Sequence, residues 1–441
     1  MNLTLAARWR ELRFLLPLFV IVPLGFAITH AAMTDLFETG PIEIAVTYAA
    51  LFVGAHLVLV MSGQRGDQLL LPTVGAMGAI GLIMLNRLPQ GIAGMSAFGI
   101  ELGMAQTQLL WFAIGLVAML VVAVGLRDDG FLRHYKYTWA VAGGLLLLFT
   151  FLFGREIYGA RLWIYVGPIG IQPGEFIKIV LVVFIAGYLA ETRSLLAGAS
   201  IRFGPISLPP LPYLLPMLAL FVAVMLVVVI SRDLGTALLF FGIFLTMLFV
   251  ATGRRVYVVF GMLLFVAGSW VAYELFGHVQ RRVNAWIDPF ADPSDTGFQT
   301  VQALYGLARG GLFGEGLGQG LLTTNGRPTI FAIETDFIFT AVAEELGVLG
   351  AMALLALALL LIFRGLRIAI GARDEFSALL AVGLTTSLGL QTLIIVAGNV
   401  KLIPLTGVTF PFVSYGGSSL LASFIVIGLL LSISHRSAAY R

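Results

Sequence analysis

The chain has 441 residues, of which 59% are hydrophobic and only 11% are charged. Soluble globular proteins are far less apolar, so this composition excludes that class. The formal net charge of +3 comes mostly from Lys and Arg in one set of loops, and it gives no indication of nucleic-acid binding. The sequence has no cysteine, which excludes disulfides, thiolate metal sites and cysteine nucleophiles.

Apolar runs of about twenty residues recur along the chain, and each is long enough to cross a hydrocarbon core as a helix. Backbone polar groups inside a membrane must be bonded within their own segment, so we expect helices rather than strands. The sequence therefore predicts an all-α polytopic membrane protein with twelve spans at residues 14–30, 41–62, 69–86, 106–126, 137–154, 171–190, 211–230, 234–252, 256–276, 336–363, 376–398 and 408–434. The first run follows a basic stretch, as in a signal peptide, but its loss would put the other spans out of step with the charge bias, so we predict a retained helix.

Lys and Arg in the loops predict the orientation of these spans. With the N-terminus inside, the inner segments hold sixteen of these cations, the outer segments hold nine, and Lys178 lies in a span, which accounts for all 26. Both termini are therefore expected on the cytoplasmic side of the membrane. The outer cations either form a site for an anionic headgroup or phosphate, or pair with outer acids such as Glu156, Asp233, Asp288 and Asp292.

One outer loop, residues 277–335, is much longer than the others. Its Pro, Asp and Gly content is typical of turns, and a loop of this length is more often functional than idle. Within it, Gly297–Leu307 has the pattern of a short amphipathic helix lying at the interface. The longest inner loop, about 191–210, ends in a Pro-rich run at residues 207–210. No internal repeat and no soluble domain are evident.

The stretch Ile333–Gly347 places Asp336 at the mouth of an apolar span, with Glu344 and Glu345 about two turns deeper. An ionisable group at the edge of a membrane span is costly and marks a candidate functional site. The alternative is that Asp336 caps the helix, since Asp is favoured at that position.

Three further segments carry polar groups at span ends. Glu175 and Lys178 are three residues apart, so on a helix they either pair with each other or line a cavity. Asp233 is best explained as a helix N-cap. The run from Phe410 to Ser419 combines Pro, two Gly and hydroxyl side chains, which serves either close helix packing or the lining of a cavity.

Other catalytic motifs are absent from the sequence, which has no GxxxxGK[ST] phosphate loop, no HExxH motif and no GxSxG elbow. ATP-driven pumping and zinc-dependent hydrolysis are therefore not expected, and no organic cofactor is predicted.

Five segments in order resemble the SEDS family of cell-wall polymerases, which includes RodA, FtsW and SpoVE. They are ARLW with QPGEFIK, RDLGTALL, DPFADPSDTGFQTVQALYGLARGGLFGEGLG, TDFIFTAVAEELG and IPLTGVTFPFVSYGGSS. The resemblance covers about residues 154–435, and the closing block with its extended N-terminal part is most similar to RodA-type members. We therefore divide the chain into N-terminal helices with few motifs, 1–135, and a polymerase-like core, 136–441, which includes loop 277–335.

The resemblance implies peptidoglycan glycosyltransferase activity on lipid II at the outer face of the membrane. The essential acid of the family falls on Asp336, and its QPSExxK pair falls on Glu175 and Lys178, with Gly174 in place of the usual Ser. The family's lead-in Pro-Glu-x-His-Thr-Asp here lacks both Pro and His. Asn399 is offset from the family's Asn before the last outer loop, since Ile395 lies nearer that place, and it is left unassigned.

In this chemistry Asp336 acts as general base on an acceptor hydroxyl, and displacement with a single carboxylate predicts inversion at the sugar. Outer arginines neutralise the leaving pyrophosphate, or a divalent cation (Mg²⁺ or Mn²⁺) held partly by Asp336 does so. Glu344 and Glu345 lie too deep to act as a second nucleophile, and Glu345 is expected to support helix packing or the cavity. The candidates for substrate contact or cavity lining are Arg161, Trp163, Glu175, Lys178, Arg232, Asp233, Gln299, Glu345, Ser414 and Ser418.

The expected partners are lipid II, polyprenyl-linked glycan, membrane lipid and a class B penicillin-binding protein, the usual transpeptidase partner of the family. A flippase or other transporter for a lipid-linked precursor is the main alternative function, because charged groups near broken helices suit one. The outer placement of these groups and the lack of an inverted repeat disfavour it. A structural scaffold is a third alternative, and it gives Asp336 no role.

Overall fold

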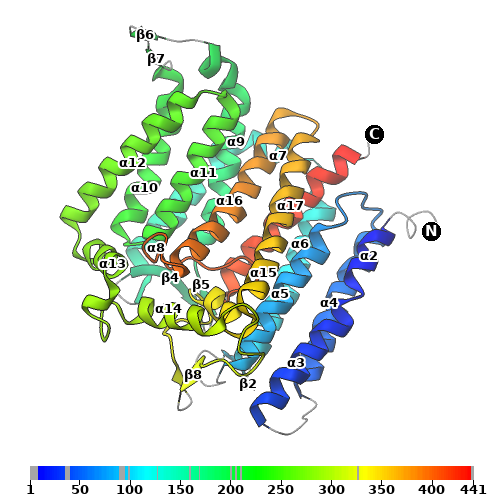
Figure 1. Cartoon of the computed structure of the whole chain (residues 1–441). Coiled ribbons are helices and arrows are strands. Elements are labelled where there is room, and N and C mark those ends of the chain that lie inside the picture. The colour runs from blue at the N-terminus through cyan, green and yellow to red at the C-terminus, as the bar shows by residue number, and fades with distance from the viewer. Residues whose placement is uncertain are drawn as a thin grey trace. The chain divides into compact units, whose positions relative to one another are not determined.

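The computed structural model describes residues 8–34, 40–88, 95–97, 100–126, 128–157, 160–167, 169–198, 201–203, 206–208, 211–324 and 327–438. Figure 1 shows that the described chain is built almost entirely of helices. Twelve helical segments in these residues are long and apolar enough to cross a membrane, which confirms the predicted number and the all-α polytopic class. The chain is a multi-pass membrane protein.

The spans are formed by the following helices: α2 Trp9–Leu15 together with α3 Leu18–Thr34, α4 Gly40–Met61, α5 Leu70–Arg87, α6 Met104–Gly125, α8 Lys136–Phe153, α9 Gly174–Gly198, α10 Leu211–Ile230, α11 Leu234–Thr252, α12 Arg255–Leu275, α15 Ile338–Ile370, α16 Glu375–Asn399 and α17 Gly417–Ala438. Most begin and end within a few residues of the predicted limits. The largest difference is in the last span, which was expected to begin at 408, whereas α17 begins at Gly417. Pro411 and the left-handed backbone of Phe412 (φ 65°) keep the preceding residues out of the helix.

Short antiparallel hairpins connect several helices, and the sequence did not indicate them. They are β1 Met95–Ala97 with β2 Ile100–Leu102; β3 Arg155–Ile157, β4 Ala160–Val166 and β5 Ile169–Ile171 in one sheet; β6 Ile201–Phe203 with β7 Ile206–Leu208; and β8 Thr323–Thr324 with β9 Arg327–Pro328. The predicted inner loop 191–210 is shortened because α9 continues to Gly198. Pro209 and Pro210 lie outside the described residues.

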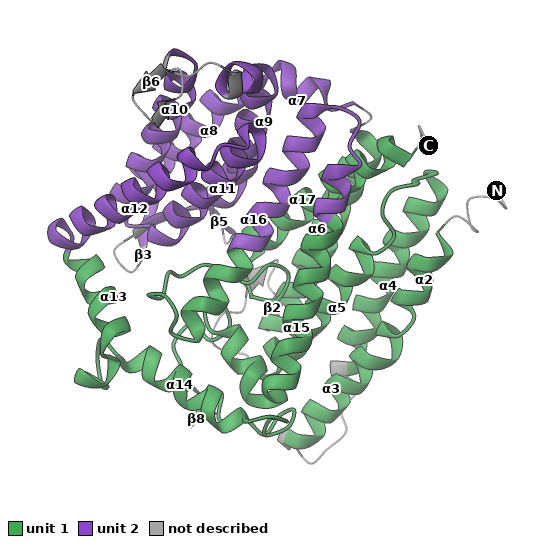
Figure 2. Ribbon diagram, turned by 45° about the horizontal axis from the view of Figure 1, so that its top comes forward, with its two compact units in different colours: residues 1–125, 277–364, 391–441 green, residues 126–276, 365–390 purple. Residues whose placement is uncertain are grey.

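The chain forms two compact units, coloured separately in Figure 2. Unit 1 comprises residues 1–125, 277–364 and 391–441, and unit 2 comprises residues 126–276 and 365–390. Within unit 1, the start of α2 and the end of α17 lie at the same end, because Arg8 donates to the carbonyl of Gln64, and Asp67 N–H in the same loop donates to Ser434. The division into 1–135 and 136–441 rests on motif content, and it stays a prediction.

The long loop 277–335 has regular structure of its own. It contains α13 Gly277–Ile287, the 3-10 helix η1 Pro289–Ala291 and α14 Phe298–Gly310. Helix α14 confirms the helix predicted at Gly297–Leu307. In unit 2, the short helix α7 Gly130–His134 precedes α8.

A glycine-rich segment, residues 311–321, follows α14 directly. It lies against a break in α15 at Gly347, which has a left-handed φ of 68°. Val348 N–H donates to the carbonyl of Gly311, and Glu315 N–H donates to the carbonyl of Glu344. A Cβ at Gly314 would clash with the backbone of Glu345, so glycine is required for this close approach. The segment therefore fixes the long loop to the helix that follows Asp336.

Candidate functional site around Asp336

Asp336 lies on a tight turn just ahead of α15. Ala332 adopts a left-handed backbone with φ of 59°, and its carbonyl accepts hydrogen bonds from the N–H groups of Thr335 and Asp336 at 3.2 and 2.9 Å. Because α15 begins at Ile338, Asp336 precedes the capping position, and its carboxylate is bonded to Thr335 instead. The geometry does not favour a capping role for this acid.

Asp336 is half-buried as a residue, and protein groups surround its carboxylate. Burial raises its pKa to about 6, although the Thr335 hydroxyl and the positive charge of Arg282 both act to lower that pKa. The nearby negative charge of Glu334 raises it further. The pKa of Glu334 is itself raised by burial. Asp336 is therefore a carboxylate whose proton affinity is tuned towards neutral pH, as general bases commonly are.

Asn399, at the end of α16, holds the Asp336 segment in place. Its side-chain N–H₂ donates to the carbonyl of Asp336 at 2.7 Å and to that of Ile395 at 2.9 Å. Its side-chain oxygen accepts from the N–H and the hydroxyl of Thr340, at 3.2 and 2.9 Å. Asn399 is thus an N-cap for α15 supplied by another helix, and all of its hydrogen-bonding groups are used.

Sequence reasoning left Asn399 unassigned because it was out of register with the family motif. The signal that indicates its role is the polar side chain itself, which closes an otherwise apolar span and is 2% exposed. Glu334 was not predicted as a site residue either, because the family's lead-in has no acid at that position. Glu334 occupies the place of the family's His, directly beside Thr335.

We predict that Asn399→Leu lowers both stability and activity. The change leaves the Thr340 N–H and the Asp336 carbonyl buried without their partner, which costs about 1–3 kcal/mol for each group. A lower thermal midpoint of the purified protein and slower glycan polymerisation are the expected measurements. Leu402→Ala, at a 70% exposed side chain in the adjoining loop, serves as the control. An Asn399→Leu variant with unchanged midpoint and rate would show that this residue does not position Asp336.

The loop before α17 contacts the Asp336 segment from a second direction. Ser414 donates its hydroxyl to the carbonyl of Thr335 at 2.6 Å and accepts from Phe410 N–H at 2.8 Å. The backbone N–H of Tyr415 donates to the carbonyl of Glu334 at 2.8 Å. Ser418 is buried at the start of α17. Ser414, a predicted site residue, therefore positions the segment that bears Asp336.

Helix α13 contacts the loop between α16 and α17, which also lies near Asp336. Arg282 donates to the carbonyls of Leu405 and Thr406 at 3.4 and 3.3 Å, and Trp286 donates to the carbonyl of Lys401 at 3.1 Å. In the same loop, a Cβ at Gly407, whose φ is 75°, would lie 3.5 Å from the Asp336 carboxylate. This loop thus brings the positive charge of Arg282 close to the acid.

Glu344 and Glu345 are fully buried, and each is paired with an arginine. Glu345 accepts from Arg87 Nε at 3.2 Å and from Gly318 N–H at 3.0 Å. Glu344 accepts from Arg309 and from Leu321 N–H, at 3.0 and 2.7 Å. Both side chains hold the glycine-rich segment against α15, which agrees with the packing role expected for Glu345.

The candidates in unit 2 form local contacts of their own. Lys178 pairs with Glu175 at 2.5 Å on α9, as the spacing predicted. Asp233 caps α11 by accepting from Thr236 N–H at 3.0 Å, which confirms the expected N-cap.

Two further unit 2 candidates lie in the β3–β5 sheet. Arg161 pairs with Glu156 at 3.4 Å at an exposed position, as the pairing alternative for the outer cations predicted. Trp163 lies beside it in β4, and Arg232, with a φ of 64°, forms the turn before Asp233. A cavity that joins these residues to Asp336 stays a prediction.

Gln299, the remaining candidate, lies on α14 in unit 1. Its side-chain N–H₂ donates to the carbonyl of Phe331 at 3.5 Å, at the start of the segment that leads to Asp336. Gln299 therefore connects the long loop to the acid's own segment, although this contact is at the limit of hydrogen-bond length.

The residues around Asp336 offer few ligands to a divalent cation. Among the described residues, no cluster of three or more Asp, Glu, His or Cys side chains could hold a metal ion. Asp336 and Glu334 together supply two carboxylates, and Mg²⁺ is commonly held by one or two carboxylates plus substrate phosphates. These two acids could hold a cation only together with a phosphate-bearing substrate, and a cation site at Asp336 stays a prediction.

Comparison with known proteins identifies the family. The profile for FtsW, RodA and SpoVE, described as "Cell cycle protein", matches residues 67–439 and so begins well before residue 154, where the resemblance in motifs begins. The peptidoglycan glycosyltransferase RodA of Mycobacterium tuberculosis (strain ATCC 25618 / H37Rv) is 42% identical over 399 residues, which cover 88% of this chain and 82% of that protein.

Solved structures agree with this match. One is a chain from a peptidoglycan synthase complex that coordinates polymerization and crosslinking, with TM-score 0.66, 27% identity and coverage of 84% of this chain and 98% of that chain. Another is the rod shape determining protein RodA of Thermus thermophilus, with TM-score 0.56, 26% identity and coverage of 84% and 97%. The twelve spans, the segment bearing Asp336 and these matches together show that the chain belongs to the FtsW/RodA/SpoVE family, as a multi-pass protein of the bacterial inner membrane.

Proposed function

We propose that this chain is a peptidoglycan glycosyltransferase that polymerises lipid II, with Asp336 as the general base. The observation that carries the proposal is the half-buried Asp336, whose backbone segment is held by Asn399 and Ser414 and whose carboxyl has a pKa of about 6. At neutral pH such a group is ionised, yet it retains a higher proton affinity than an ordinary Asp.

In the proposed reaction, Asp336 removes the proton from the hydroxyl of the acceptor sugar as that oxygen attacks the anomeric carbon of the donor. The bond from the anomeric carbon to the lipid pyrophosphate breaks on the opposite side, so the configuration is inverted. The pyrophosphate is a good leaving group and needs charge neutralisation more than protonation. Arg282 is placed to supply positive charge near the acid. A divalent cation, when bound by Asp336 and Glu334, would supply further neutralisation of the pyrophosphate.

The orientation and the partner belong to the same proposal. The bias of Lys and Arg supports an outer location for Asp336 and a cytoplasmic location for both termini. The similarity to a chain of a complex that coordinates polymerization with crosslinking supports association with a transpeptidase of the class B penicillin-binding type. Lipid II and a polyprenyl-linked glycan are the substrates that this chemistry requires.

A polymerisation assay in detergent tests the proposal against the transporter alternative. Detergent micelles have no second compartment, so a flippase has no measurable product in them. We expect purified full-length protein and lipid II, with Mg²⁺ or Mn²⁺ present, to yield glycan chains. Absence of polymer under these conditions and in the presence of the transpeptidase partner would reject the enzymatic assignment.

The acidic limb of the pH–rate profile tests the role of Asp336 as a base. Below a pH of about 6 the carboxyl is protonated and cannot accept a proton, so the rate should rise as the pH increases through that value. Glu334→Gln removes a charge that raises the pKa of Asp336, and the limb should move to lower pH. Arg282→Gln removes a charge that lowers this pKa, and the limb should move to higher pH.

The measurement is kcat/KM for polymerisation between pH 4.5 and 8 (a range of roughly two units around the limb). Arg281→Gln is the matched control, because it removes an exposed arginine next to Arg282 that has no resolved influence on Asp336. Shifts of both variants in the same direction would contradict the assignment, and so would a profile that neither variant moves.

A further inference from the structure

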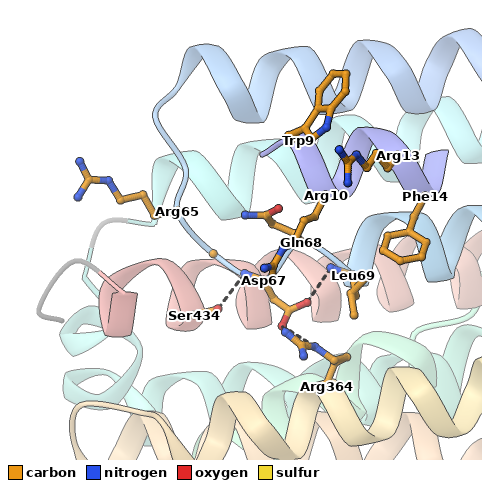
Figure 3. A pocket seen from close by; sticks show the side chains of 11 residues that line it. Trp9, Arg10, Arg13, Phe14, Arg65, Asp67, Gln68, Leu69, Arg364 and Ser434 are labelled. Carbon is orange, nitrogen blue, oxygen red and sulfur yellow. Dashed lines mark hydrogen bonds and ion pairs between the residues drawn. The ribbon is translucent and has the colours of Figure 1, made fainter. Parts of the chain in front are cut away.

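A basic cavity lies at the end of unit 1 away from Asp336. Its volume is about 1120 Å³. Figure 3 shows that its walls come from α2, from the link between α4 and α5, and from the ends of α15 and α17. Arg364 lies 26 residues beyond Ile338 on α15, so most of the length of that helix separates this cavity from the proposed catalytic acid. The lining residues are Trp9, Arg10, Arg13, Phe14, Arg65, Gly66, Asp67, Gln68, Leu69, Arg364 and Ser434.

Buried ion pairs behind the lining of this cavity fix α2 in place. Arg8 is 1% exposed, and it donates to Glu11 and to the carbonyl of Gln64 at 3.2 and 3.1 Å. His56 Nδ1 lies 2.6 Å from the same Glu11 carboxylate. These contacts connect α2 to α4 and to the following link, so the cavity has a rigid frame.

The acidic side chains near the cavity are already paired with cationic side chains of the protein. Glu11 is paired with Arg8 and His56, and Asp67 accepts from Arg364 Nε at 2.7 Å and from Leu69 N–H at 2.8 Å. Asp67 is the one carboxylate in the lining, against four arginines. The cavity therefore has an excess of positive charge.

Three of the lining arginines remain available to a ligand. Arg10, Arg13 and Arg65 are exposed, and none of them has a carboxylate partner among the described residues. They come from two different elements, α2 and the α4–α5 link, and they line the same space. Guanidinium groups bind phosphate through paired N–H donors, so this arrangement suits a phosphate-bearing anion.

The cavity also has an exposed apolar wall at the start of the first span. Trp9 and Phe14 are 49% and 57% exposed, and the guanidinium of Arg13 lies 5.5 Å from the centre of the Trp9 ring. Helix α3 follows directly and exposes Val20 and Ile21, which are 66% and 56% exposed. Aromatic and cationic side chains beside an apolar helix face are typical of the level of lipid headgroups.

We propose that this cavity binds the phosphate of an anionic phospholipid headgroup, whose acyl chains lie along α3. Free phosphate would meet the same arginines, but the exposed aromatic wall and the adjoining helix face favour the lipid. The positive-inside bias predicts this face on the cytoplasmic side, where anionic lipids attract basic groups. The cavity volume is comparable to that of pockets that enclose small ligands, about 300–1,000 Å³.

Native mass spectrometry of the full-length protein tests the proposal. The delipidated protein is offered phosphatidylglycerol and phosphatidylcholine with the same acyl chains, and the wild type should retain phosphatidylglycerol preferentially. The double variant Arg10→Gln/Arg13→Gln should weaken that retention about thirty-fold, and Arg65→Gln, on the other element, about five-fold. Each of these arginines is exposed, so the substitutions should leave the fold intact. Circular dichroism and an unchanged thermal midpoint check this.

The matched control is Arg255→Gln/Arg367→Gln, which removes two exposed arginines from segments predicted on the same membrane face but outside the cavity. Inorganic phosphate in hundred-fold excess distinguishes the two sources of the anion. Retention of phosphatidylglycerol against phosphate identifies the lipid, and complete displacement identifies free phosphate as the ligand of the same arginines. The proposal is overturned if the cavity variants retain as much phosphatidylglycerol as the control variant.

Discussion

Asp336→Asn should reduce polymerisation of lipid II by about 10² to 10⁴-fold while leaving the protein folded in the membrane. The amide has nearly the same shape as the carboxylate but cannot accept the proton of the acceptor hydroxyl. The contacts that position this segment use the backbone carbonyl of Asp336 and not its side chain, since Asn399 donates to that carbonyl at 2.7 Å. Loss of activity is therefore expected without loss of structure.

The measurement is glycan chain formation by the purified variant, together with its thermal midpoint. Burial raises the pKa of Asp336, which means that the ionised carboxylate is less stable in the folded protein than in water. Replacement by a neutral amide should therefore leave the midpoint unchanged or raise it slightly. Asp295→Asn, at an exposed acid of the same long loop, is the control and should polymerise at the normal rate. An Asp336→Asn variant that forms glycan at the rate of the control variant would exclude Asp336 as the general base.

The fold could be predicted from sequence because its main determinant is the length of each apolar run. Every predicted span has a helix in the structure, since a helix satisfies its own backbone groups and needs no partner to be recognised. The hairpins were missed for the opposite reason. β1, β2, β6 and β7 are each three residues long, too short for an alternating pattern, and pairing with a neighbouring segment rather than composition defines them.

The site could be predicted only in part. Its acid lies in a recognisable motif, but the residues that position the acid do not. Asp336 was recognisable as a charged residue at the edge of a span. Asn399 is separated from it by more than sixty residues, and only the packing of α16 against the start of α15 brings the two together. The left-handed turn at Ala332 gives no sequence signal either, since neither Gly nor Asn is present there. Contacts of this kind depend on tertiary structure.

Glu345→Ala should destabilise the protein by about 3–5 kcal/mol, because it leaves a buried cation without its partner. Glu345 is fully buried, and Arg87 is 11% exposed. The truncation removes the acceptor of the Arg87 Nε bond and of the Gly318 N–H bond, at 3.2 and 3.0 Å. Since Gly318 belongs to the glycine-rich segment 311–321, that segment should detach from α15 before the helices themselves unfold.

Unfolding in detergent and limited proteolysis within residues 311–321 measure this effect. Glu345→Gln keeps an acceptor oxygen and should lose less stability than Glu345→Ala. The double variant Arg87→Leu/Glu345→Leu removes both charges, and it should be more stable than the sum of its single changes predicts, because neither charge then remains buried alone. Glu315→Gln, at an exposed acid of the same segment, is the control for a change of charge alone. Cleavage of Glu345→Ala no faster than that of Glu315→Gln would show that the ion pair does not hold the segment. The close contacts between Gly314 and the backbone near Gly347 would then hold it instead.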